Sequence, residues 1–491
     1  MSFPVFLKKF PFHFILVVLF FLLHGYSENV GLIPFIDLLI FFIVAIAAGF
    51  VLYFIFKKLV RLSGNAGITT SVLFLFYLFF GSIKDALKPG ILYPFSRYTI
   101  LIPSMLLILA ALVFFFRKGR KEFPRLTMFI NSLLLVYLVI DTATILIRSG
   151  QPAKQPAAIQ SNFKKCDTCP KPDIYFIILD EYSGSHVLRD YFRYDNSSFE
   201  DALRRRGFFV ASAPSSNYSA TPVSIASIFS MDYLPAFHRK ITAEDYTRSE
   251  KIVESGPVMQ FVTGHGYNFR NHSIFNLAGQ PGQFKTDLLP MRLKLITSKT
   301  LWNTVYKDLG WNIHARIAPG FPLLAKVLQD DYKDGNQRLL DMTFKAVTNR
   351  EARPRFIYTH LLMPHWPYLF DSTGRETGIN FYDKGLPRAQ KENAYIQYLA
   401  YTNKVMINLA DSIIGQSRGE AAIILMSDHG YREKPGKQTC SSVNNNFLSV
   451  YLPGKDYRLF YDSMSNVNLF RSVFNTLFQQ QFVQLPDRCI F

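Results

Sequence analysis

The sequence predicts an α/β protein in which five membrane-spanning helices precede a domain built on a mostly parallel central sheet. Two observations carry this prediction. Apolar residues crowd the first 150 positions, in runs long enough to cross a bilayer. Further along, continuous apolar runs of strand type occur at 174–179, 356–362 and 421–426, as in strands buried on both faces.

The N-terminal apolar runs lie near 10–26, 34–56, 67–83, 98–116 and 126–147. Each approaches the roughly 20 helical residues that cross a bilayer core of about 30 Å. The first run could be a signal peptide, but four more follow it and no small-residue cleavage site comes after His24. We therefore expect a transmembrane domain of five helices over 1–148.

Basic residues predict the orientation of these helices. The segments expected in the cytoplasm carry Lys8, Lys9, Lys57, Lys58, Arg61, Arg117, Lys118, Arg120, Lys121 and Arg125. The opposite loops carry only Lys84, Lys88 and Arg97. With an odd number of spans, the later domain is expected outside the cytoplasm. The sequence thus predicts a multi-pass protein of the plasma (inner) membrane with an extracytoplasmic or periplasmic domain.

The formal net charge of +18 could indicate a nucleic-acid partner. Membrane topology accounts for much of that excess, and a nucleic-acid enzyme would rarely sit outside the cytoplasm. A basic outer domain suits anionic lipid headgroups or envelope polymers better. We expect such membrane and envelope partners and no nucleic acid.

The chain has four cysteines, Cys166, Cys169, Cys440 and Cys489, all in the expected outer domain. In an oxidising compartment they favour disulfides, pairing Cys166 with Cys169 and Cys440 with Cys489. The Cys-Asp-Thr-Cys spacing could instead form half of a zinc site, although no second close pair of ligands completes it.

Residues 149–172 have the Ser, Gly, Gln, Pro and Lys content of a linker, and a single catalytic domain is expected over 173–491. Its first strand, 174–179, ends in Asp180 and Glu181. Acids at the carboxyl end of a buried strand stand where open α/β sheets bind ligands. A helix cap or turn is the alternative for this pair.

A helix ending in Gly207 is expected over 198–206, followed by a short extended run at 208–210 and the loop that delivers Thr221. Thr221 precedes Pro222, and helical spacing follows, so Thr221 is predicted to be the N-cap of a helix. A hydroxyl there lies beside unpaired N–H groups that attract a phosphate or sulfate. The alternative is that Thr221 only caps the helix.

The later strands also end in polar residues. The strand at 356–362 contains His360 and runs into a loop in which two prolines bracket His365. The strand at 421–426 leads to Asp428 and His429, a metal-ligand pair followed by Gly430, which lets the backbone turn. A helix is expected near 393–415, another from Val258 to Gly266, and 270–340 is assigned no chemistry.

Together, the acids after the first strand, Thr221 at a helix start, the Pro-His-Trp-Pro loop at 364–367 and Ser-Asp-His-Gly at 427–430 resemble the alkaline-phosphatase-like superfamily. The layout resembles its membrane-anchored branch, which includes phosphoethanolamine transferases and lipoteichoic acid synthases. The resemblance implies an α/β sandwich for the outer domain. It covers nearly the whole chain.

This resemblance implies roles for seven residues. Thr221 matches the nucleophilic threonine of the transferases, and His360 and His365 match histidines that bind the substrate's phosphate. The metal ligands implied are Asp180, Glu181, Thr221, Asp428 and His429. Two departures stand out: the cysteine and arginine of the sulfatase motif are replaced by Thr221 and Ile225, and Tyr-Arg-Glu-Lys at 431–434 replaces the glutamate usual in the transferases.

These residues predict a metal-dependent transferase that moves a phospho-headgroup from a lipid donor to an envelope glycan or lipid acceptor through a threonine intermediate. Zinc suits the oxygen and nitrogen ligands, with manganese or calcium as alternatives. A membrane-tethered sulfatase or phosphodiesterase with the same site is the alternative enzyme. The alternative from another functional class is a binding or scaffolding protein that kept the fold and lost catalytic turnover.

Overall fold

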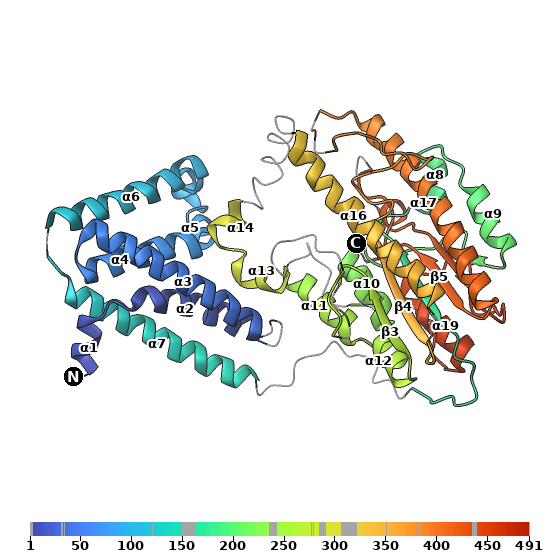
Figure 1. The fold of residues 1–491 in the computed structure, drawn as a ribbon, viewed down its shortest axis with the longest axis horizontal. Coiled ribbons are helices and arrows are strands. Elements are labelled where there is room, and N and C mark those ends of the chain that lie inside the picture. The colour runs from blue at the N-terminus through green and yellow to red at the C-terminus, as the bar shows by residue number, and fades with distance from the viewer. Residues whose placement is uncertain are drawn as a thin grey trace. The chain divides into compact units, whose positions relative to one another are not determined.

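The computed structural model describes residues 3–30, 33, 35–119, 121–149, 163–234, 243–275, 277, 279–283, 291–305, 322–349, 351–381, 383, 385–434 and 439–490. Most of the predicted linker lies outside these residues. The chain divides into two compact units (Figure 1). Unit 1 comprises Met1–Lys154 and Leu289–Asn312, and unit 2 comprises Gln155–Leu288 and Ile313–Phe491.

Unit 1 is helical. Its elements are α1 (Phe3–Lys9), α2 (His13–Glu28), α3 (Phe35–Val60), α4 (Ser63–Leu78), α5 (Phe80–Ala86), the 3-10 helix η1 (Gly90–Ser96), α6 (Tyr98–Gly119), α7 (Pro124–Ser149), α13 (Met291–Thr297) and α14 (Leu301–Val305). Each of the five predicted apolar runs falls on one or two of these helices.

By length and composition, fewer than five of the described helices qualify as membrane spans, so the predicted count of five is approximate. Among the described residues, α3, α6 and α7 are long and apolar enough to cross a membrane. Helices α4 and α5 qualify only as a pair, because the chain bends by 69° between them. Helix α2 has 16 residues and is shorter than a full span. Apolar composition therefore located the helices correctly, but the bend and the short first helix make their count approximate.

The segment 291–305 packs within unit 1, although it follows the first half of unit 2 in the chain. The N–H of Gly81 donates to the carbonyl of Lys299 at 2.7 Å, and Lys299 pairs with Asp85. Gly25 leaves room for this segment, since a Cβ there would lie 2.9 Å from Ile296. Part of the stretch 270–340, to which the sequence assigned no chemistry, thus belongs to unit 1.

In the described part of unit 2, six strands form one sheet. Their order is β2 (Phe209–Val210), β6 (Leu448–Tyr451), β5 (Ala422–Met426), β1 (Ile174–Leu179), β4 (Arg355–Leu361) and β3 (Asn268–His272). Strand β1 runs parallel to β4 and β5, and β3 runs parallel to β4. Strand β6 runs antiparallel to both of its neighbours, β2 and β5. The prediction of a mostly parallel sheet is confirmed.

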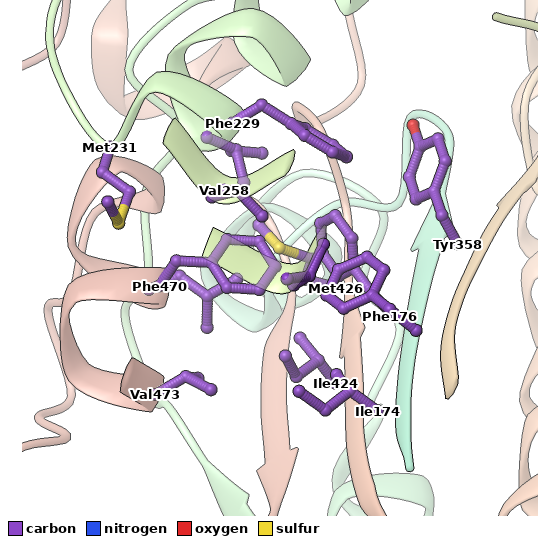
Figure 2. Close-up of a cluster of buried hydrophobic side chains, with 14 of the residues drawn as sticks. Ile174, Phe176, Phe229, Met231, Val258, Tyr358, Ile424, Met426, Phe470 and Val473 are labelled. Atoms are coloured by element: carbon purple, nitrogen blue, oxygen red, sulfur yellow. The ribbon is translucent and has the colours of Figure 1, made fainter. Parts of the chain in front are cut away.

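Helices cover both faces of this sheet. On one face lie α10 (Thr221–Ser230), α12 (Pro257–Gly264) and α19 (Leu469–Phe478). Figure 2 shows this core, in which Phe229 and Phe470 surround Phe176 of β1. The rings of Phe176 and Phe470 meet edge to face at 5.0 Å. Burial of such rings stabilises the packing of these helices on the sheet.

The other face is covered by α9 (Ser197–Arg205), α16 (Pro322–Thr348) and α17 (Arg388–Ser417). Successive residues of β1 alternate between the two cores, with Tyr175, Ile177 and Leu179 on this side. All six residues of β1 are buried, which explains its unbroken apolar sequence. The remaining elements of unit 2 are α8 (Ser185–Asp190), α11 (Ala243–Ser255), α18 (Cys440–Val443) and η3 (Asn466–Asn468).

Both predicted disulfides are confirmed. Cys166 pairs with Cys169, and Cys440 pairs with Cys489. The zinc alternative for the first pair is therefore wrong. The second bond joins the C-terminal tail to the segment that follows the Asp428–His429 loop.

Candidate active site

The carboxyl ends of β1 and β5 bring four predicted residues to one edge of the sheet. Asp180 and Glu181 follow β1 directly, and Asp428 and His429 follow β5 after a single serine. Because these strands are parallel neighbours, their polar ends leave the sheet side by side. The N–H of Glu181 donates to Oδ1 of Asp428 at 3.2 Å, which ties the two segments together.

Thr221 lies at the start of α10, and its hydroxyl faces His429. The predicted N-cap is wrong by one residue: Ala220 is the N-cap, and Thr221 is the first helical residue. Oγ1 of Thr221 lies 3.1 Å from Nε2 of His429. The other ring nitrogen, Nδ1, lies 2.8 Å from the carbonyl oxygen of Gly430. A carbonyl only accepts, so Nδ1 carries the proton and Nε2 presents its lone pair to Thr221.

Two buried carboxylate oxygens converge on the same nitrogen. Oδ2 of Asp428 lies 3.3 Å from Nε2 of His429, and Oδ1 of Asp180 lies 3.6 Å from it. Neither oxygen has a hydrogen-bond partner among the described residues. The potential ligand atoms of the three residues lie within 4.8 Å of one another. Buried oxygens left unpaired in this way are costly without a cation, so the group fits a divalent metal ion.

The carboxylate of Glu181 contacts Arg432 and His365, which lie outside this group. Its Oε1 accepts the backbone N–H of Arg432 at 3.0 Å and lies 3.8 Å from the Nε of that side chain. Its Oε2 lies 3.7 Å from Nε2 of His365. The backbone of Glu181 has a φ of 62°, a conformation that non-glycine residues rarely adopt and that recurs at functional sites.

The two predicted substrate-binding histidines lie in different surroundings. His360 is fully buried: its Nδ1 lies 3.0 Å from the hydroxyl of Tyr358, and its Nε2 lies 3.5 Å from Oδ2 of Asp180. His365 is partly exposed, and its Nδ1–H donates to the carbonyl of Trp366 at 2.6 Å. His365 is therefore accessible from solvent, whereas His360 contacts Asp180 in the interior.

Burial and neighbouring charges shift the pKa values of the site. Burial, and then the charge of Asp180, raises the pKa of Asp428 to about 6. Burial alone would raise the pKa of Asp180, but the imidazoles around it, His365 first, hold that pKa below its usual range. Burial, and then the charge of Arg432, lowers the pKa of His429 to about 3. His429 is thus neutral at physiological pH, the form that can bind a cation.

Gly430 is required for a close approach and not for the turn that the sequence predicted. It does not adopt a positive φ. Its N–H donates to the carbonyl of Val443 at 2.7 Å, and a Cβ would lie 2.3 Å from the carbonyl oxygen of Asn445. Only glycine lets the segment carrying His429 dock against this backbone.

Sequence reasoning missed the contacts of two further residues. Ser224, on the first turn of α10, is fully buried and donates to the carbonyl of Asp428 at 2.6 Å. Arg432 reaches His365, with Nη2 and Nε2 3.2 Å apart. The sequence signal that could have indicated Arg432 is a basic residue two positions after Gly430, in the same loop as Asp428 and His429.

Several solved structures are similar to this chain. The C-terminal periplasmic domain of EcEptC from Escherichia coli is 14% identical, with a TM-score of 0.40, covering 65% of this chain and 84% of that one. The integral membrane protein lipooligosaccharide phosphoethanolamine transferase A from Neisseria meningitidis is 12% identical, with a TM-score of 0.39, covering 96% and 95%. The phosphonate monoester hydrolase of Agrobacterium radiobacter is 13% identical, with a TM-score of 0.38, covering 62% and 73%.

No curated protein matches the sequence. The family model described as Sulfatase matches residues 202–473. These residues include Thr221, His360, His365 and the Asp428–His429 pair. The match spans more than half of the 491 residues. The chain belongs to the sulfatase family.

Proposed function

We propose that the protein is a membrane-anchored, metal-dependent transferase that moves a phospho-headgroup from a lipid donor to an envelope glycan or lipid acceptor. Thr221 would carry the group between them. The observation that supports this most directly is the 3.1 Å between Oγ1 of Thr221 and Nε2 of His429, because it places a hydroxyl against the cluster of potential metal ligands. The apolar helices of unit 1 would hold the enzyme beside its lipid donor.

Asp180, Asp428 and His429 would hold the metal ion, and Thr221 would complete the set. Zinc fits two carboxylates, an imidazole and a hydroxyl, with manganese or calcium as alternatives. When bound, the ion would lower the pKa of the Thr221 hydroxyl and so favour its nucleophilic form. Glu181, also predicted as a ligand, is engaged by Arg432 and His365 and is better suited to orienting those side chains.

In the first step, Oγ1 of Thr221 forms a bond to phosphorus, and the bond from phosphorus to the diacylglycerol oxygen breaks. The threonine proton leaves to solvent, and the departing oxygen takes a proton from His365. Burial disfavours a charged imidazole, but Asp180 and Glu181 raise the pKa of His365, which suits a proton donor.

In the second step, an acceptor hydroxyl forms a bond to phosphorus and gives its proton to His365. The bond between phosphorus and Thr221 breaks, and the threonine oxygen takes a proton back. Water in place of the acceptor would make the same site a hydrolase, the alternative for a sulfatase-family chain.

The test uses the full-length protein with phosphatidylethanolamine vesicles. We expect release of diacylglycerol and a headgroup adduct on the peptide that contains Thr221, detected by mass spectrometry. Thr221→Ala should abolish both, and Ser219→Ala, in the same loop, should retain them. Near-normal release by Thr221→Ala would refute the assignment. Free phosphoethanolamine without any modified acceptor would favour the hydrolase.

A further inference from the structure

Arg432 is a charged residue of the site to which the proposed mechanism gives no task. It lies in the loop that follows Gly430, and its guanidinium reaches three parts of the site. Nη2 lies 3.2 Å from Nε2 of His365, and Nε lies 3.8 Å from Oε1 of Glu181. Nη1 donates to the carbonyl of Ser219 at 3.4 Å. Ser219 is two residues before Thr221, so the guanidinium borders the nucleophile's loop.

The charge of Arg432 suits an incoming anion. Asp180, Glu181 and Asp428 place three carboxyl groups at this edge, and a phosphodiester or sulfate ester brings further negative charge. An arginine stays protonated throughout the physiological range. About a third of its side chain, 36%, is exposed, so a group arriving from solvent can reach it.

Three contacts of the guanidinium measure 3.2–3.8 Å, whereas charge-assisted hydrogen bonds to an oxyanion measure about 2.7–2.9 Å. A tetrahedral oxyanion between Thr221 and Arg432 would form such shorter bonds with the guanidinium. The planar fork of arginine matches two oxygens of such a group, which a lysine cannot do.

We propose that Arg432 binds the non-bridging oxygens of the transferred group and so forms, with His365, the oxyanion-binding side of the site. This inference rests on the proposed function for the identity of the group. It adds a substrate-binding residue in the Tyr-Arg-Glu-Lys segment at 431–434, where the sequence departs from the transferases.

The test measures binding of inorganic phosphate, and separately of sulfate, to the full-length metal-loaded protein by titration calorimetry. Arg432→Gln should weaken phosphate binding about 10- to 100-fold, the usual effect of losing hydrogen bonds to a charged group. Arg432→Lys should weaken it less, since the charge remains. Arg458→Gln is the matched control, because Arg458 is exposed and pairs with Asp456. It should bind phosphate as the unmodified protein does.

A purely structural role for Arg432 predicts a different pattern. Arg432→Gln would then lose stability or metal, while phosphate binding per metal-loaded molecule would stay unchanged. Unchanged phosphate affinity in both Arg432 variants overturns the proposal. If Arg432→Gln does not fold, Arg432→Lys decides, since equal affinity for phosphate would exclude a bidentate role.

The phosphate measurement is independent of turnover. If the protein never transfers a headgroup, the proposed function is contradicted. If Arg432→Gln still loses phosphate binding in that case, the inference stands. Normal headgroup transfer with an unchanged KM in Arg432→Gln would contradict only the inference. Stronger weakening for sulfate than for phosphate would identify a sulfate ester as the group.

Discussion

Gly430→Ala adds one methyl group at the point where the loop carrying His429 meets the backbone of residues 443–445. The new Cβ would lie 2.3 Å from the carbonyl oxygen of Asn445 and 2.9 Å from that of Val443. Real Cβ contacts essentially never fall under 3.0 Å, so the backbone must move by at least about 0.7 Å. Forcing extra atoms into a packed region costs about 1–3 kcal/mol.

The functional effect should exceed the effect on stability. The methyl group displaces the residue next to His429, whose Nε2 lies 3.1 Å from Thr221. Because a shift of about 1 Å in a reacting group can cost about 100-fold in rate, we expect turnover to fall by about that factor and metal affinity to fall with it. Turnover of a lipid donor, metal content by elemental analysis and the thermal unfolding midpoint measure the three effects.

Gly454→Ala is the matched control for this substitution. A Cβ at Gly454 would meet nothing within 4 Å, so turnover, metal content and unfolding should stay as in the unmodified protein. Full turnover and full metal content in Gly430→Ala would refute the reasoning, because the close approach would then not hold His429 in place.

Three further predictions concern topology, the acids and acid stability. A reporter fused after residue 150 should be active only outside the cytoplasm, and cytoplasmic activity would contradict the orientation drawn from the basic residues. Asp180→Asn should lose bound metal, whereas Glu181→Gln should keep it and lose activity; the opposite result in elemental analysis would reverse their roles. Burial, with Arg270 nearby, lowers the pKa of His272 from 6.5 to about 4. Between these pH values the unfolded chain binds a proton more readily than the folded protein does. The free energy of unfolding should therefore fall as the pH drops through this range, by up to about 3 kcal/mol. His272→Asn should remove that dependence in thermal unfolding, and an identical pH profile would exclude His272 as its source.

The central strands were predictable because their sequences are unambiguous. Strand β1 has the predicted bounds, β5 begins one residue later than predicted, and β4 is shifted by one residue at both ends. Parallel buried strands require unbroken apolar runs, and their carboxyl ends share one edge of the sheet. From this shared edge, the sequence alone predicted that Asp180 and Asp428 lie close together.

Other elements left weaker signals. Strand β6, Leu448–Tyr451, has four residues and pairs antiparallel with β5, so its formation depends on contacts distant in sequence. Helix α16, Pro322–Thr348, has 27 residues, and most of it falls in the stretch 270–340, to which the sequence assigned no chemistry. The grouping of residues 291–305 with the membrane unit depends on packing against Gly25 and Gly81, which no local pattern encodes.

The division of roles between Asp180 and Glu181 shows what decides function at this edge. Both acids follow the same strand and both are buried, so composition and position predict the same role for each. The backbone separates them: Glu181, at a φ of 62°, directs its carboxylate to Arg432, while Asp180 directs Oδ1 toward His429. We therefore expect this rare conformation to separate the two acids, with Asp180 at the proposed metal cluster and Glu181 beside Arg432. Arg432 belongs to the segment 431–434, where the sequence departs from the transferases, so family likeness does not supply this pairing.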